Sequence, residues 1–152
     1  MVNGLNKVDL KEFLDEKYQE YNNVDFIEQD PIQIPHLFTE KKDIEIAGFL
    51  TSVISWGNRK SIINSAHKLM NILDNSPYDF VKNSNHSEIK KIQFVHRTFN
   101  SIDLQFFIQS LKNIYKNYDS LEDVFIDNQN DFMFDGISKF RKIFFSVNHE
   151  KR

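Results

Sequence analysis

Two short clusters in this chain carry the residue types that contact phosphate or nucleic acid. The first is Trp56-Gly57-Asn58-Arg59-Lys60, which places the sole tryptophan beside a glycine and two cations. A tryptophan or arginine at such a point can stack on a base or enter a duplex, and N–H groups at a helix start bind phosphate. The second is His96-Arg97, followed by Asn100. Its cation suits contact with phosphate. The candidate nucleic-acid-binding residues are therefore Trp56, Asn58, Arg59, Lys60, His96 and Arg97.

Both clusters also have a purely structural interpretation. Trp56 can close the joint between two helices as a buried ring, with Arg59 and Lys60 as an ordinary surface pair. His96 can be a buried side chain that bridges two loops. The sequence leaves these alternatives open.

Other kinds of site lack the residues they need. The chain has no cysteine, which excludes disulfides and cysteine-ligated zinc. Its five histidines do not pair at a metal-binding spacing, and its four glycines are too scattered to build a phosphate loop. Ser65 and His67 lie on one predicted helix, but their side chains point to different faces, so they do not form a catalytic pair. Asp43 and Glu45 stand early in a predicted helix, where the helix dipole and solubility explain them without a catalytic role. We therefore predict no catalytic residue, no metal and no cofactor.

Composition and charge indicate one globular domain, residues 1–152, with an uneven surface. Hydrophobic residues make up 40% of the 152 residues, which is ample for a core. No signal peptide or membrane-spanning run is present, so the expected location is cytoplasmic. Residues 1–45 hold five lysines and eleven acidic residues, whereas residues 46–152 hold fourteen Lys and Arg residues and eleven acidic ones. The net charge of −3 is a poor overall match to nucleic acid. The local charge is compatible with a nucleic-acid surface in the later part of the chain, and no such surface is expected in the first helix.

The elements that position the two clusters are predicted to be helices. Four glycines and three prolines are few for an all-β protein. Helical spacing and capping residues predict helices at 9–22, 39–56, 60–74, 103–118 and 131–146, with a corner at Gly57. Residues 23–38, with Pro31 and Pro35, are predicted to form an irregular strap, and 93–99 are ambiguous between strand and turn. The expected fold class is an all-α orthogonal bundle with Leu50, Val53, Ile54 and Ile63 buried.

The phenylalanines of the last two predicted helices point in several directions around the helix axes, so one packed face per helix cannot bury all of them. They are Phe106, Phe107, Phe132, Phe134, Phe140, Phe144 and Phe145. We therefore expect a partner for this surface, either a second copy in a homodimer or a missing C-terminal half.

Several strings resemble an uncharacterised bacterial family of conserved hypothetical proteins, domain of unknown function 2400. The strings are Asp30-Pro31, Ile34-Pro35-His36 and the residues at 43–49, 56–60, 74–80 and 96–100. The family has no established activity. Its members continue past the point that corresponds to Arg152, so the resemblance implies that this chain is an N-terminal portion.

The helix pair around Gly57 is also distantly similar to the helix-hairpin-helix DNA glycosylases. In that superfamily an apolar helix ends in a serine-containing corner, here Ile54-Ser55-Trp56-Gly57-Asn58, which fills the gap left by a flipped base. The similarity implies contact with duplex DNA through Trp56, Asn58 or Arg59. The glycosylase hairpin and its catalytic aspartate have no counterpart after Phe99.

The similarity thus implies an all-α fold like the N-terminal half of a glycosylase, and a DNA-binding domain without the catalytic half. Enzyme activity is not expected of this chain alone. The alternative is a structural or protein-interaction domain that a partner or a dimer completes.

Overall fold

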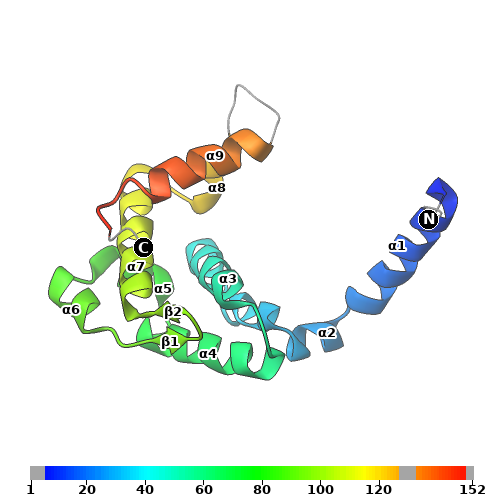
Figure 1. Cartoon of the computed structure of the whole chain (residues 1–152), viewed down its shortest axis with the longest axis horizontal. Coiled ribbons are helices and arrows are strands. Elements are labelled where there is room, and N and C mark those ends of the chain that lie inside the picture. The colour runs from blue at the N-terminus through cyan, green and yellow to red at the C-terminus, as the bar shows by residue number, and fades with distance from the viewer. Residues whose placement is uncertain (1–5, 127–132, 150–152) are drawn as a thin grey trace.

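The computed structural model describes residues 6–126 and 133–149, which form a helical bundle with one projecting arm (Figure 1). The helices are α1 (Lys7–Tyr21), α2 (Val24–Gln29), α3 (Lys41–Ile54), α4 (Arg59–Ile72), α5 (Pro77–Asn83), α6 (His86–Lys91), α7 (Ser101–Asn117), α8 (Leu121–Phe125) and α9 (Met133–Phe144). Two-residue strands, β1 (Val95–His96) and β2 (Phe99–Asn100), pair antiparallel and are the only sheet in the described ranges. The predicted all-α bundle is confirmed.

The core lies mainly between α3, α4, α5 and α7. Its α3 side consists of Ile46, Ala47, Leu50 and Ile54, and its α7 side of Leu104, Ile108, Leu111 and Ile114, all buried. These residues recur every three or four positions, which places them on one face of each helix. Leu50 and Ile54 are buried as predicted, whereas Val53 and Ile63 are only half-buried.

The corner between α3 and α4 forms as the sequence predicts, with helix bounds one or two residues different. Gly57 has a φ of 107°, which an L side chain rarely adopts. The Asn58 side chain caps α4 by accepting a hydrogen bond from the Ser61 backbone N–H at 3.1 Å.

The segment 23–38 is more regular than the irregular strap that we predicted. It contains α2 and two 3-10 turns, η1 (Pro31–Gln33) and η2 (Pro35–Leu37). Asn23 caps α2, Asp30 caps η1, and each proline stands at the start of its turn, where the missing N–H costs nothing. Prolines thus begin turns here instead of preventing them.

Two carboxylates near the start of α3 accept hydrogen bonds from other helices and so hold those helices against α3. The sequence did not reveal this role. Asp43 accepts a hydrogen bond from the Tyr78 backbone N–H at 2.8 Å, at the start of α5. Glu45 accepts one from the Leu121 backbone N–H at 2.9 Å and one from the Tyr115 hydroxyl at 3.0 Å. Burial, with the nearby Glu45 charge, raises the pKa of Tyr115 above its ordinary range.

The C-terminal phenylalanines pack more completely than predicted, because their rings cover one another. Phe144 is buried, and Phe106, Phe107 and Phe140 are partly buried against the core. Phe134 and Phe145 remain 75% and 50% exposed. Phe132 lies outside the described residues.

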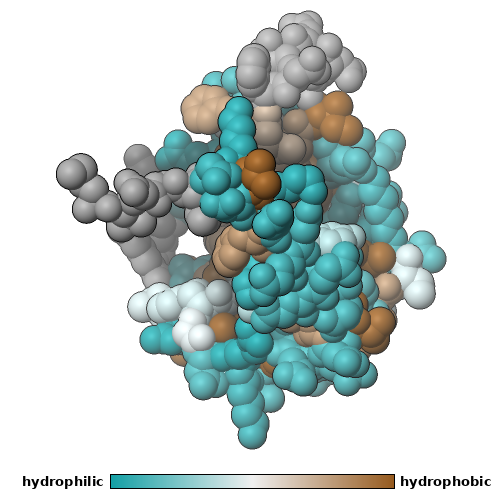
Figure 2. Space-filling view, turned by 90° about the vertical axis from the view of Figure 1, so that its right-hand side faces the viewer, coloured by the Kyte–Doolittle hydropathy of each residue, from teal (hydrophilic) through white to brown (hydrophobic). Residues whose placement is uncertain are grey.

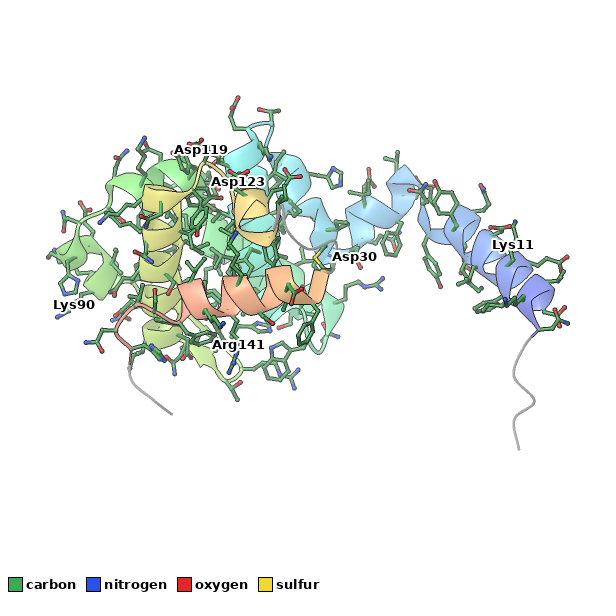
Figure 3. All side chains as sticks on the ribbon, turned by 90° about the horizontal axis from the view of Figure 1, so that it is seen from above. Lys11, Asp30, Lys90, Asp119, Asp123 and Arg141 are labelled. Atoms are coloured by element: carbon green, nitrogen blue, oxygen red, sulfur yellow. The ribbon has the colours of Figure 1, made fainter. Side chains whose placement is uncertain are left out.

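The arm formed by α1 points away from the bundle (Figure 1) and has no buried residue. Figure 3 places Lys11 on this arm, well away from Asp30, where the chain reaches the bundle. The side of the molecule shown in Figure 2 is largely hydrophilic, with hydrophobic side chains in separate patches. None of the described helices is both long and apolar enough to span a bilayer.

Candidate nucleic-acid interface

The two clusters predicted from the sequence meet in space at the α3–α4 corner. The β1–β2 hairpin lies against this corner and carries Arg97 in its turn, with a φ of 55° (Figure 1). The Arg97 guanidinium carbon lies 4.5 Å from the centroid of the Trp56 ring, a cation–π contact. The guanidinium also packs on Gly57, where an added Cβ would lie 1.9 Å from Arg97 Nη1. The backbone angle therefore favours glycine here, and a Cβ would in addition displace the end of the Arg97 side chain.

Trp56 keeps part of its ring available to a ligand. It is 42% exposed, so it is not the fully buried ring of the structural alternative. Arg97 is exposed as well, while carrying the contact with Trp56. Together the two side chains present a positive charge and part of an aromatic ring to solvent.

His96 is buried, as its structural alternative predicts, so its ring is shielded from solvent. It is 4% exposed, and its ring stands edge-to-face with Trp56 at 6.4 Å between centroids. Its Nδ1 lies 2.8 Å from Ser65 Oγ on α4, and its buried Nε2 has no hydrogen-bond partner among the described residues. Trp56, Gly57, His96 and Arg97 are called the corner cluster below.

The remaining predicted residues divide into different roles. Asn58 uses its side chain as the α4 cap. Arg59 turns to the segment before α3, with Nε 3.7 Å from Asp30 Oδ2 and the guanidinium 6.0 Å from the Phe26 ring. Lys60 stays on the exposed surface of α4. Of the six candidates, Arg59 is therefore the one already held by a carboxylate.

The electrostatics of this surface are one-sided. The segments 46–73 and 89–102, which include the corner, α4 and the hairpin, contain no aspartate or glutamate. Lys60, Lys68 and Arg97 form no ion pair within the described part of the chain. Asp30 neutralises Arg59, but the charges of Lys60, Lys68 and Arg97 are left available and favour an anionic ligand. In the same part of the chain, no group of three or more His, Cys, Asp or Glu side chains could hold a metal ion.

Sequence reasoning missed four polar residues on α4 that line a groove beside the corner cluster. They are Ser61, Asn64, Ser65 and Lys68. Their helical spacing places them on one face, which was a usable signal. The link from Ser65 to His96 joins residues 31 apart in the chain and had no signal in the sequence.

Comparison with known proteins gives one match. A family model described as "Protein of unknown function (DUF2400)" matches residues 30–152. No curated protein and no solved structure matches the chain. The matched range contains the corner cluster and all of α4, whereas α1 and α2 precede it.

Proposed function

This chain belongs to the DUF2400 family of proteins of unknown function, and we propose from its surface chemistry that it binds the backbone of duplex DNA. The observation that carries the proposal is the exposed Arg97 guanidinium held on Trp56, in a region whose segments 46–73 and 89–102 contain no acidic residue and include Lys60 and Lys68. Lysine and arginine side chains supply most of the sequence-independent affinity for nucleic acid.

Contact with phosphates suits this geometry better than insertion into the base stack. Arg97 already occupies a contact on the Trp56 ring, and His96 stands against the same ring. A tryptophan held in this way is less free to slide between bases than an isolated wedge. The ring serves to hold the cation in place.

The glycosylase-like interpretation of the same corner remains a narrower proposal. In it, Trp56 or Asn58 would fill the gap left by a flipped base. Because residues 46–73 and 89–102 contain no aspartate or glutamate, and the Asp30 carboxylate near the corner is engaged by Arg59 and by the Ile32 backbone N–H, we expect the chain to release no damaged base from a duplex. Base release above the buffer rate, lost on changing one acidic residue, would contradict this expectation.

The direct test is equilibrium binding to a labelled short duplex. We expect weak, non-specific binding in the range of about 10⁻⁴–10⁻⁶ M, with log affinity falling linearly as log salt rises. Arg97→Gln should weaken binding about tenfold and reduce the salt slope by about one. Since Trp56 is the only tryptophan, its fluorescence should also change on binding.

The matched control is Lys116→Gln, which removes one charge at the far end of α7. Lys116 is exposed, and α7 separates it from the hairpin by about 20 Å along the helix axis. This variant should leave affinity within about twofold, allowing for the overall change in charge. Equal losses for both variants, or no salt-dependent binding by the unchanged protein, would refute the proposal.

A second candidate function is a protein-interaction domain completed by a partner. It is favoured by the exposed apolar side chains of α9, which are Met133, Phe134 and Ile137. Soluble monomers rarely expose a large contiguous apolar patch. If α9 pairs with a second copy, light scattering should give a mass that rises with protein concentration, and Phe134→Ser should restore the monomer. A monomer at all concentrations would remove the dimer from consideration.

A further inference from the structure

A shallow groove beside the corner cluster runs along the exposed face of α4. Its volume is about 480 Å³, and we call it the α4 groove. It is lined by Asn58, Lys60, Ser61, Asn64, Ser65 and Lys68 of the α4 segment and by Val95 of β1. Among the described residues, no carboxylate lines it. Hydroxyls and a side-chain amide stand between the two lysines, which lie about 12 Å apart along the helix axis.

This set of side chains is suited to one kind of ligand. Lys60 and Lys68 have no ion pair within the described residues, so each can neutralise an anion. Ser65 and Asn64 can donate hydrogen bonds to oxygens, as serine and asparagine do at phosphates. The openness of the groove to solvent allows a phosphate that belongs to a longer molecule to enter.

His96 orients the hydroxyl of Ser65 through a hydrogen bond. His96 Nδ1 lies 2.8 Å from Ser65 Oγ, and the ring is 4% exposed and rests edge-to-face on Trp56. If Nδ1 accepts a hydrogen bond from the Ser65 hydroxyl, Ser65 presents only lone pairs to the groove and repels an anion. If Nδ1–H donates to Oγ, the hydroxyl proton is free to point into the groove. An anion therefore selects the Nδ1–H form.

We propose that the α4 groove is a phosphate subsite in which Ser65 and Asn64 donate hydrogen bonds, Lys60 and Lys68 neutralise the charge, and His96 is a positioning residue. The subsite rests on the proposed function for its natural ligand, a backbone phosphodiester, and free phosphate shares the same chemistry. His96 acts only through Ser65, because it is buried. The corner cluster and the subsite are thereby joined through one histidine ring.

The test is an amide NMR titration of the whole chain with inorganic phosphate, against chloride at matched ionic strength. Phosphate should shift the Asn64 and Ser65 signals, and Ser65→Ala should weaken phosphate binding about tenfold, as expected for a lost hydrogen bond to a charged group. Lys68→Gln should weaken it as well. Ser87→Ala, an exposed serine on α6 outside the groove, is the matched control and should change nothing.

The role of His96 has its own readout. Nitrogen chemical shifts should show a protonated Nδ1 and an unprotonated Nε2 in the presence of phosphate. His96→Asn, whose amide can stand at the Nδ1 position, should keep most of the binding, whereas His96→Leu should lose as much as Ser65→Ala. An Nε2–H tautomer with phosphate bound, or equal binding by the two variants, would overturn the positioning role.

The outcomes separate the subsite from the proposed function. Phosphate binding in the groove without binding of duplex DNA would support the subsite and refute the proposed function. Salt-dependent DNA binding that survives Ser65→Ala and Lys68→Gln, with no phosphate shift at Asn64, would refute the subsite and leave the proposed function in place. Thermal melting of each variant identifies any loss that comes from unfolding.

Discussion

The two ends of α3 use charge in opposite ways. At its start, Asp43 and Glu45 accept hydrogen bonds from the first residues of α5 and α8, so their charges are satisfied inside the fold. At its end, Trp56 and Gly57 hold the Arg97 cation, which forms no ion pair with a described residue. The first end therefore stabilises the bundle, and the second leaves charge available to a ligand. Substitutions at the two ends should change different measurements.

The largest expected effect is on stability, at Glu45. Glu45→Ala leaves the Leu121 N–H and the Tyr115 hydroxyl without their acceptor. Because hydrogen bonds to charged groups contribute more than neutral ones, we expect a loss of about 3 kcal/mol in the free energy of unfolding, measured in urea. DNA affinity of the folded protein should not change.

Glu40→Ala provides the control for this prediction, since Glu40 is exposed and its side chain makes no capping hydrogen bond. It should alter stability by less than about 0.5 kcal/mol. If Glu45→Ala has an equally small effect, the contrast between the two ends of α3 fails.

An intermediate effect is expected at Gly57, where the comparison predicts loss of both stability and binding. Gly57→Ala forces a side chain into a positive φ and against the Arg97 guanidinium. We expect a loss of about 1–2 kcal/mol in unfolding free energy and weaker DNA binding, because Arg97 is displaced from Trp56.

Gly48→Ala is the matched control on the same helix. An added Cβ there would lie 3.8 Å from Pro35, an ordinary contact, and alanine favours the helical backbone. This variant should be neutral or slightly stabilising and should bind DNA normally. A similar loss in both variants would show that the corner is no more constrained than the middle of α3.

The smallest expected effect is a pH dependence of stability, which comes from the contact between Tyr115 and Glu45 at the first end of α3. The pKa of Tyr115 is raised by burial and by the Glu45 charge, so the folded state favours the neutral phenol. Its contribution to stability is constant below the ordinary tyrosine pKa of about 10 and is lost as pH rises toward the folded value. Stability should therefore fall above about pH 10, and less steeply in Tyr115→Phe.

Urea midpoints from about pH 8 to about pH 11 measure this difference. Tyr18→Phe on the exposed arm should keep the full alkaline loss. An unchanged slope in Tyr115→Phe would mean that another group causes the alkaline loss.

The sequence could predict features that depend on neighbouring residues. Gly57 and Asn58 act within a few positions, so the corner and the start of α4 were found. The prolines of segment 23–38 alone predict an irregular strap, although Asn23 caps the helix α2 and Asp30 caps the turn η1. The Phe106 and Phe144 rings pack on each other, with 5.4 Å between their centroids. The positions of phenylalanines around each helix axis do not predict such a contact between helices.

The contacts that define the candidate site were beyond sequence reasoning because they depend on packing. Ser65 and His96 are 31 residues apart, and Glu45 and Leu121 are 76 apart. Each residue looked ordinary in its own segment. Asp43 and Glu45 were attributed to the helix dipole and solubility for the same reason, since the helices that they hold come much later in the chain.

The projecting arm divides the chain into two units of very different cooperativity. α1 has no buried residue, so it can unwind without breaking a core contact. A helix of fifteen residues is marginal in water by itself. Its amide protons should therefore exchange with solvent through local opening at almost no free-energy cost, whereas those of the α7 interior exchange only when the bundle unfolds. The heat-absorption peak on melting should therefore report the bundle alone, and the helical signal of the arm should decrease gradually on either side of it.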